Sequence, residues 1–268
     1  MRIPVSGVAI NCVLEGRAGA PVITFAHSLA ATLGLWEAQA AALADRYQVL
    51  RYDARGHGES DVPPGPYTLD QMTGDLIGLL DALDIRETHF VGLSMGGCTG
   101  MMAALAHPAR IASLVLADTT SRYAPEAAVM WADRIRTAET AGMEPLIEPT
   151  MRIWFTERFR QQAKPAVDRV RDMLRRTEPR GYVAAIRAIA DVDLTDAIAA
   201  IRCPTLVVVG RDDPGTPVAM AEVMRARIPG AGLVVLPDAA HASCVEAAAP
   251  FTDAVARFLA RVAAPAGR

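Results

Sequence analysis

The chain has 268 residues, 51% of them hydrophobic and 21% charged, with a formal net charge of −3 at pH 7. This length fits one large α/β domain, and the nearly balanced charge argues against a nucleic-acid partner. Residues 18–36 and 91–109 carry no charged side chain, but prolines, glycines and polar residues interrupt both, so we expect no membrane span.

The first 120 residues alternate between segments typical of strands and of helices. Strands are expected at 8–14, 22–26, 47–52, 88–91 and 111–116, and helices at 35–45, 69–83 and from residue 94 to about 106. Such alternation predicts a mainly parallel sheet with helices on both faces.

The loop Arg55-Gly56-His57-Gly58-Glu59-Ser60 follows the expected strand 47–52 and has two glycines, as phosphate-binding loops do. It lacks the lysine pattern of such loops, and no helix begins directly after it. We therefore interpret it as a tight structural loop, in which His57 is not catalytic.

The run Gly92-Leu93-Ser94-Met95-Gly96-Gly97 follows the expected strand 88–91 directly. A serine that attacks a carbonyl has to stand clear of its backbone, which a sharp strand-to-helix turn achieves when small residues flank it. Gly92 and Gly96, two positions either side of Ser94, provide that space. The run is therefore interpreted as a nucleophile elbow.

Between residues 121 and 200 the alternation stops, and amphipathic helical stretches are punctuated by prolines and glycines. The alternating pattern then returns, with strands expected at 205–209 and 233–236 and helices at 217–228 and 245–262. A helical insertion within one continuing sheet suggests a lid over its catalytic edge. We therefore predict a core of residues 1–120 and 201–268 and a helical cap of residues 121–200.

A serine nucleophile needs a histidine base and a carboxylate that orients it. His241, in the loop between the last expected strand and the last helix, is the candidate base because it lies late in the chain. Gly210-Arg211-Asp212-Asp213-Pro214 follows strand 205–209 at the same edge. We choose Asp213 as the acid, because Pro214 rigidifies the turn that presents it, and keep Asp212 as the alternative.

The oxyanion that forms on attack needs two preorganised donors. The backbone N–H of Met95, at the start of the helix after the nucleophile, is the first candidate. The second is the N–H of Leu29, in the loop after strand 22–26. We interpret His27, in that loop, as a buried hydrogen-bonding residue beside the pocket rather than as a second base.

These motifs together resemble the α/β-hydrolase fold family, and the match spans almost the whole chain. Runs 50–58, 62–69 and 92–97 and Trp154-Phe155-Thr156 resemble 3-oxoadipate enol-lactonases of the β-ketoadipate branch of aromatic catabolism. The resemblance implies a cap inserted after the sixth strand, the triad Ser94, Asp213 and His241, and hydrolysis of an enol-lactone to 3-oxoadipate without a cofactor.

The substrate of such lactonases carries a carboxylate, for which arginine is the expected partner. Among the many cap arginines we choose Arg134, beside Trp131, and we add His27 and Trp154 as candidate pocket residues. A short-chain carboxylesterase and a cofactor-free haloperoxidase-like perhydrolase use the same triad and stay open as alternatives. A ligand receptor on the same fold is less favoured, because the triad is complete.

The four cysteines are scattered and show no metal-ligand spacing. The first residues lack the apolar core of a signal peptide. We therefore expect a cytoplasmic enzyme that uses no metal, with a small ester or lactone as its partner. The sequence gives no indication of the oligomeric state.

Overall fold

The computed structural model describes residues 1–263. These residues form an eight-stranded sheet in the order β1-β2-β4-β3-β5-β6-β7-β8. The strands are β1 (Arg2–Val5), β2 (Val8–Gly16), β3 (Val22–Ala26), β4 (Gln48–Tyr52), β5 (Thr88–Leu93), β6 (Ile111–Ala117), β7 (Thr205–Gly210) and β8 (Gly232–Leu236). The pairs β1–β2 and β2–β4 are antiparallel and the others parallel, which confirms the predicted mainly parallel sheet. Strand β1 was not among the expected segments.

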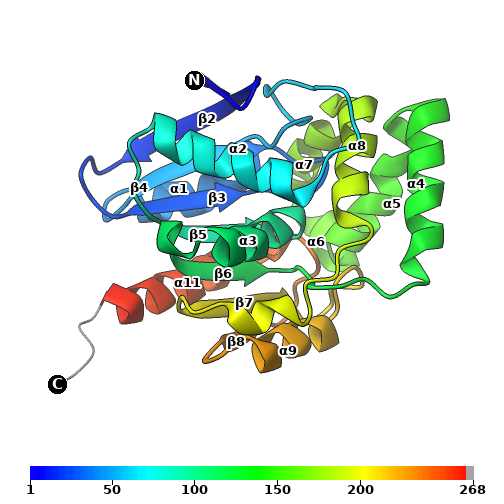
Figure 1. Cartoon of the computed structure of the whole chain (residues 1–268). Coiled ribbons are helices and arrows are strands. Elements are labelled where there is room, and N and C mark those ends of the chain that lie inside the picture. Colours follow the sequence, from blue (N-terminus) through cyan, green and yellow to red (C-terminus); the bar gives the residue numbers. More distant parts are fainter. Residues whose placement is uncertain (264–268) are drawn as a thin grey trace.

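Helices cover both faces of this sheet (Figure 1). One face carries α1 (Glu37–Leu43) and α11 (Ala248–Ala263), and the other carries α2 (Leu69–Ala82), α3 (Met95–Ala106) and α9 (Val218–Arg227). Short helical turns lie in the connections: η1 (Leu33–Trp36), η2 (Pro108–Arg110), η3 (Ala197–Ala200) and α10 (Ser243–Glu246). The helices expected at 35–45 and 245–262 are thus each divided into a short turn and a longer helix.

Five more helices lie between β6 and β7, a stretch that the structure describes throughout. They are α4 (Ala127–Ala141), α5 (Glu144–Trp154), α6 (Glu157–Gln162), α7 (Lys164–Arg176) and α8 (Pro179–Ile189), and we call them the cap helices. Figure 1 shows them, in green to yellow-green, beyond the carboxyl ends of the central strands. The helical insert after the sixth strand is thereby confirmed, whereas the division of the chain into domains at residues 120 and 200 stays a prediction.

The central strands are buried because helices cover both sides of them. Strand β7 is buried along its whole length, and β5 and β6 each have only one residue that is partly exposed. Their sequences are accordingly almost continuous apolar runs, as expected for parallel strands covered on both faces. None of the helices formed by residues 1–263 combines the length and apolarity needed to cross a membrane.

Candidate active site

Ser94 occupies a strained turn between β5 and α3. Its φ is 53° and its ψ −112°, a conformation that costs a non-glycine residue about 1–3 kcal/mol. A Cβ atom on Gly92 would lie 2.3 Å from the carbonyl oxygen of Gly96, and one on Gly96 would lie 2.3 Å from that of Ala26. Larger residues at these two positions would therefore displace the backbone. The geometry is that of the nucleophile elbow expected from the sequence.

His241 and Asp213 form a buried pair at the carboxyl ends of β7 and β8. The distance from His241 Nδ1 to Asp213 Oδ2 is 2.9 Å. Asp213 Oδ1 accepts hydrogen bonds from the backbone N–H groups of Gly215 (2.7 Å) and Thr216 (3.1 Å), and Oδ2 accepts one from the Thr216 hydroxyl (2.7 Å). These donors fix the carboxylate, which in turn orients the imidazole and keeps the proton on Nδ1.

The neighbouring carboxyl of Asp212 lies in a different environment. Asp213 is only 3% exposed, whereas the side chain of Asp212 is exposed to solvent. The backbone N–H of Asp212 donates to the carbonyl of Ala239 (2.9 Å). Of the two candidate acids, the structure brings Asp213 to His241.

The buried pair shifts both pKa values in the direction that favours charge separation. Burial opposes the charged form of each group, but the interaction between the two outweighs it. The charge and hydrogen bond of Asp213 raise the pKa of His241, and those of His241, together with the Thr216 donors, lower the pKa of Asp213. An imidazole held in this way is a stronger base than a free histidine.

Ser94 and His241 line one cavity of about 80 Å³ between the sheet edge and the cap helices. Leu29 lines it as well, in the loop after β3, and Met95 begins α3 directly after the nucleophile. Within residues 1–263, neither Leu29 nor Met95 uses its backbone N–H in a hydrogen bond. Two free amide donors beside a serine are what an oxyanion hole requires.

His27 does not reach the cavity. Its Nδ1 atom lies 2.7 Å from the carbonyl oxygen of Ser28, and its Nε2 accepts a hydrogen bond from the backbone N–H of Ala54 (2.9 Å). The side chain is 1% exposed, and burial lowers its pKa. His27 therefore ties the loop that carries Leu29 to the end of β4. Of the four predicted pocket residues, it is the one that the structure places elsewhere.

The cap helices contribute Arg134 and Trp131 from α4 to the opposite wall. The Arg134 guanidinium donates from Nε to the Tyr182 hydroxyl (2.7 Å) and from Nη2 to the Thr150 hydroxyl (2.6 Å). Trp131 is 8% exposed, and its indole Nε1 has no hydrogen-bond partner in the described part of the chain. This wall thus presents the Arg134 cation to the cavity, and the Trp131 indole nitrogen is buried within the wall.

Trp154, at the end of α5, connects the cap helices to the histidine loop. Its ring centroid lies 6.2 Å from that of His241, and its carbonyl oxygen accepts a hydrogen bond from the backbone N–H of Ala242 (2.9 Å). Glu246 adds a second connection, because its carboxylate accepts from the N–H groups of Ala240 (3.0 Å) and Thr156 (3.2 Å). The loop that carries the candidate base His241 is therefore held partly by hydrogen bonds to the cap.

Tyr123 is a cavity residue that the sequence did not indicate. Its ring packs edge-on against Trp131, with centroids 5.3 Å apart, and it lines the cavity with Ser94. Burial raises the pKa of the Tyr123 hydroxyl, and an interaction with the Ser94 hydroxyl partly opposes that rise. The one signal in the sequence is its position shortly after strand 111–116, at the sheet edge where the other site residues gather.

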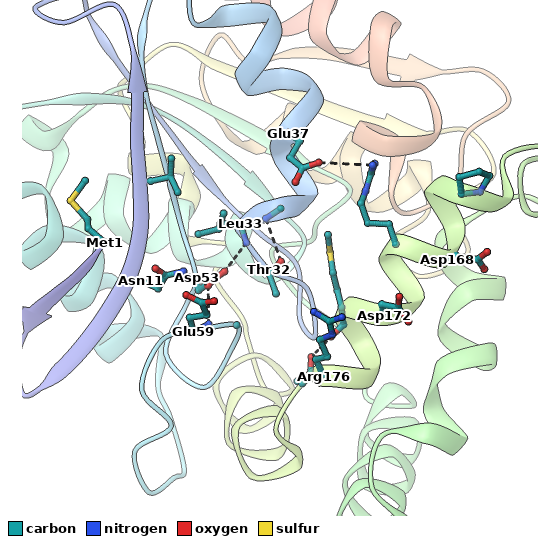
Figure 2. Close-up of a pocket in the computed structure, with 17 residues that line it drawn as sticks. Met1, Asn11, Thr32, Leu33, Glu37, Asp53, Glu59, Asp168, Asp172 and Arg176 are labelled. Carbon is teal, nitrogen blue, oxygen red and sulfur yellow. Dashed lines mark hydrogen bonds and ion pairs between the residues drawn. The ribbon is translucent and has the colours of Figure 1, made fainter.

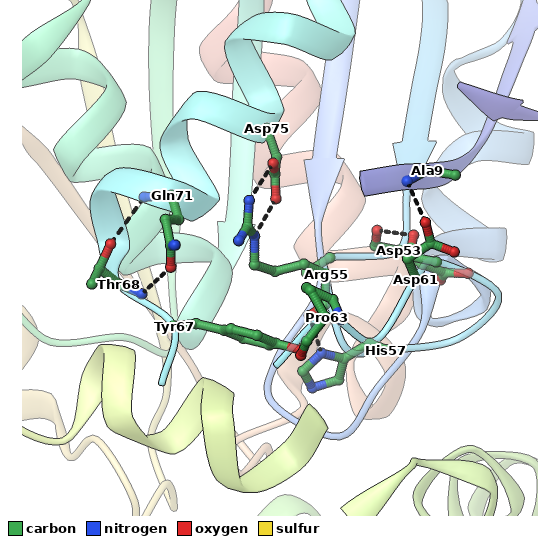
Figure 3. A network of polar contacts seen from close by, with 12 residues as sticks. Ala9, Asp53, Arg55, His57, Asp61, Pro63, Tyr67, Thr68, Gln71 and Asp75 are labelled. Carbon is green, nitrogen blue, oxygen red and sulfur yellow. Dashed lines mark hydrogen bonds and ion pairs between the residues drawn. The ribbon is translucent and has the colours of Figure 1, made fainter. Parts of the chain in front are cut away.

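None of the residues in the loop Arg55 to Ser60 lines the cavity of Ser94 and His241. Figure 3 shows Arg55 donating from Nε (2.6 Å) and Nη2 (2.7 Å) to the two carboxylate oxygens of Asp75 on α2. The His57 side chain is only 1% exposed, and its Nδ1 atom lies 3.1 Å from the carbonyl oxygen of Arg55. Burial, together with the neighbouring His27, lowers the pKa of His57 to about 3. This histidine stays neutral at physiological pH and lines no part of the cavity.

A larger groove of about 900 Å³ lies between α7 and the core (Figure 2). Several acidic side chains line it, but neither Ser94 nor His241 does. Asp53 accepts hydrogen bonds from Asn11 Nδ2 (2.8 Å) and the Leu33 N–H (2.7 Å), so its carboxylate stabilises the neighbouring backbone segments. Within residues 1–263, no cluster of histidine, cysteine and acidic residues has the arrangement of a metal site.

Comparisons with known proteins show which family the fold belongs to. The family model described as alpha/beta hydrolase fold matches residues 21–248. The chain is 35% identical to 3-oxoadipate enol-lactonase 2 of Acinetobacter baylyi over 95% of this chain and 94% of that protein. Among solved structures, the enol-lactonase of Burkholderia xenovorans LB400 is 37% identical, with a TM-score of 0.94 over 97% of this chain and 100% of that one. A malate-bound thermophilic esterase from Thermogutta terrifontis is 30% identical, with a TM-score of 0.92 over 98% of this chain and 100% of that one.

Proposed function

This chain belongs to the α/β-hydrolase fold family, and we propose that it is a serine hydrolase that opens a small enol-lactone, with 3-oxoadipate enol-lactone as the first candidate. The similarity to two enol-lactonases over nearly the whole chain supports this substrate class. The observation that carries the proposal is that Ser94, His241 and Arg134 of the cap line one small cavity together.

The proposed reaction proceeds through an acyl-enzyme. Ser94 Oγ attacks the lactone carbonyl while His241 takes its proton, and the amides of Leu29 and Met95 bind the oxyanion. The ring C–O bond then breaks, and the enolate oxygen, which stays attached to the acyl chain, takes the proton from His241 to give an enol that rearranges to the ketone. Water attacks the acyl-enzyme, with His241 again as base, and releases the new carboxylate and free Ser94. Asp213 orients His241 and stabilises the imidazolium.

Arg134 is the proposed partner of the carboxylate that the lactone carries besides its ester. The two groups that hold its guanidinium, Tyr182 and Thr150, are neutral hydroxyls, so its positive charge is not neutralised by them.

A carboxylesterase of small acidic esters is the second candidate. The similarity to the malate-bound Thermogutta esterase supports it, because malate is a small dicarboxylate. The same serine chemistry serves both activities, so the two differ only in the leaving group that the cavity accommodates.

A substrate panel tests the proposal. We expect kcat/KM for 3-oxoadipate enol-lactone to exceed that for simple p-nitrophenyl esters by orders of magnitude, and Ser94→Ala to abolish turnover of both while its circular dichroism spectrum matches the unaltered protein. A clear preference for simple esters would reject the lactonase proposal and favour the esterase. Turnover retained by Ser94→Ala would reject the serine mechanism itself.

A further inference from the structure

A second carboxyl lies beside the Asp213–His241 pair and has no part in the mechanism described so far. Asp118 follows β6 directly, at the sheet edge where the site lies. It is fully buried, with a φ of 40° that is strained for a non-glycine residue. Its backbone N–H donates to the carbonyl of Val208 (2.9 Å), which holds it against β7.

The Asp118 carboxyl joins the two loops that carry the candidate acid and base. Oδ1 accepts a hydrogen bond from the backbone N–H of Gly210 (2.7 Å), three residues before Asp213. Oδ2 accepts one from the hydroxyl of Ser243, two residues after His241. One buried side chain thus contacts both loops.

The surroundings of Asp118 favour its neutral form. Burial, and then the negative charge of Asp213, raise its pKa to about 8, although His241, Ser243 and Gly210 act in the opposite direction. The influence is mutual, because a negative charge on Asp118 raises the pKa of His241. A negative charge on Asp118 also acts on the Cys244 thiol. Burial raises the pKa of that thiol well above its ordinary value, so Cys244 stays neutral.

We propose that Asp118 is a positioning residue of the Asp213–His241 pair: it fixes the two loops together and, by gaining or losing its proton, changes the strength of His241 as a base. The role of this pair in catalysis rests on the proposed function. The link between Asp118 and His241 does not, because it concerns the proton affinity of an imidazole that can be observed without substrate.

Two substitutions separate the two parts of the proposal. Asp118→Asn keeps both contacts, since its amide oxygen can accept from Gly210 and its NH₂ can donate to Ser243, but it cannot ionise. Asp118→Ala removes both contacts. Asp212→Asn is the matched control, because it removes an exposed carboxylate next to Asp213.

The experiment is an NMR titration of the His241 imidazole, combined with pH profiles of kcat/KM. Because Asp118 loses its proton near pH 8, the His241 resonances and the pH profile should show a second step there, which Asp118→Asn should abolish and Asp212→Asn should leave in place. In Asp118→Ala we expect kcat to fall about tenfold or more with little change in KM, because a small displacement of the base is costly.

Each outcome decides one point. A second step near pH 8 that persists in Asp118→Asn would overturn the proposed tuning, and an unchanged kcat in Asp118→Ala would overturn the positioning role. If Asp118→Ala does not fold, Ser243→Ala replaces it, and a normal kcat in that variant would count against positioning. Loss of the proposed function would instead appear as turnover in Ser94→Ala, with the titration of His241 still readable.

Discussion

The two sides of the candidate catalytic cavity are built differently. On the sheet side, Asp213 and His241 are held by backbone groups and by one another, and the Asp213 carboxylate accepts several hydrogen bonds. On the cap side, Arg134 is held by two neutral hydroxyls, and Trp131 keeps a donor without an acceptor. The Asp213–His241 pair is fully hydrogen-bonded without a substrate, whereas the Arg134 cation on the cap side is held only by neutral hydroxyls.

This difference separates chemistry from selectivity. A preorganised and fully hydrogen-bonded pair needs no rearrangement at the moment of reaction. Unsatisfied donors instead discriminate among ligands, because a molecule that lacks the matching acceptor leaves them unpaired. Substitutions on the sheet side should therefore reduce kcat for every ester. Substitutions on the cap side should change the kinetics for some substrates and not for others.

The largest effect is expected on the sheet side. Asp213→Asn should lower kcat by about 10⁴-fold, because the wrong imidazole tautomer would face Ser94, with KM nearly constant. Asp212→Asn is the matched control and should stay within about twofold of the unaltered enzyme. Steady-state kinetics on one activated ester suffices, and the reverse ranking of the two variants would show that Asp212 is the acid.

Arg134 tests the cap side. Arg134→Gln should raise KM for an anionic lactone by about 10–100-fold, the loss of one charge-assisted contact, and leave a neutral ester of similar size almost unaffected. Arg136→Gln, at an exposed arginine of the same helix α4, is the control and should change neither substrate. Equal losses on anionic and neutral substrates would contradict a carboxylate-binding role.

Tyr123 contacts Trp131 on the cap side and Ser94 on the sheet side, so removing its hydroxyl should reduce activity less than the loss of Asp213 does. Tyr123→Phe keeps the packing on Trp131 and loses only the hydroxyl beside Ser94. We expect kcat to fall about two- to tenfold, for anionic and neutral esters alike. A change confined to anionic substrates would instead assign the Tyr123 hydroxyl to the cap side of the comparison.

The smallest effect is one of stability. The folded-state pKa of Asp118 is raised to about 8, far above the value of about 3.9 for an unfolded chain. The folded protein therefore holds a proton that the unfolded chain loses, so stability declines as the pH rises between these values. Asp118→Asn should not show this decline, so its Tm relative to that of the unaltered protein should rise as the pH is raised from 5 toward 8. A Tm difference that does not vary with pH would mean that Asp118 is ionised throughout.

Much of the sheet side could be predicted because its residues occur at recognisable positions in the sequence, directly after the expected strands. A strained serine turn needs glycines at fixed spacing, and loops that follow parallel strands meet at one edge. Ser94, Asp213 and His241 could therefore be chosen together, although whether they are catalytic stays a prediction.

The remaining features depend on packing that a sequence does not show. Asp118 also follows an expected strand, but its burial against Gly210 and Ser243 is a property of the folded molecule. Arg134 could be chosen among many cap arginines, yet its partners Thr150 and Tyr182 come from two other helices. His27 faces the backbone, because Ala54 supplies a donor from a neighbouring strand end.

The attachment of α5 to the histidine loop has a consequence for how this enzyme can acquire new substrates. Because the Ala242 N–H is bonded to the Trp154 carbonyl and Glu246 connects Ala240 with Thr156, mutations near the end of α5 disturb the base as well as the pocket. Helix α4 carries Trp131 and Arg134 without such a connection to His241. In laboratory evolution, improved variants should accumulate along α4, while libraries at the end of α5 should yield mostly inactive clones.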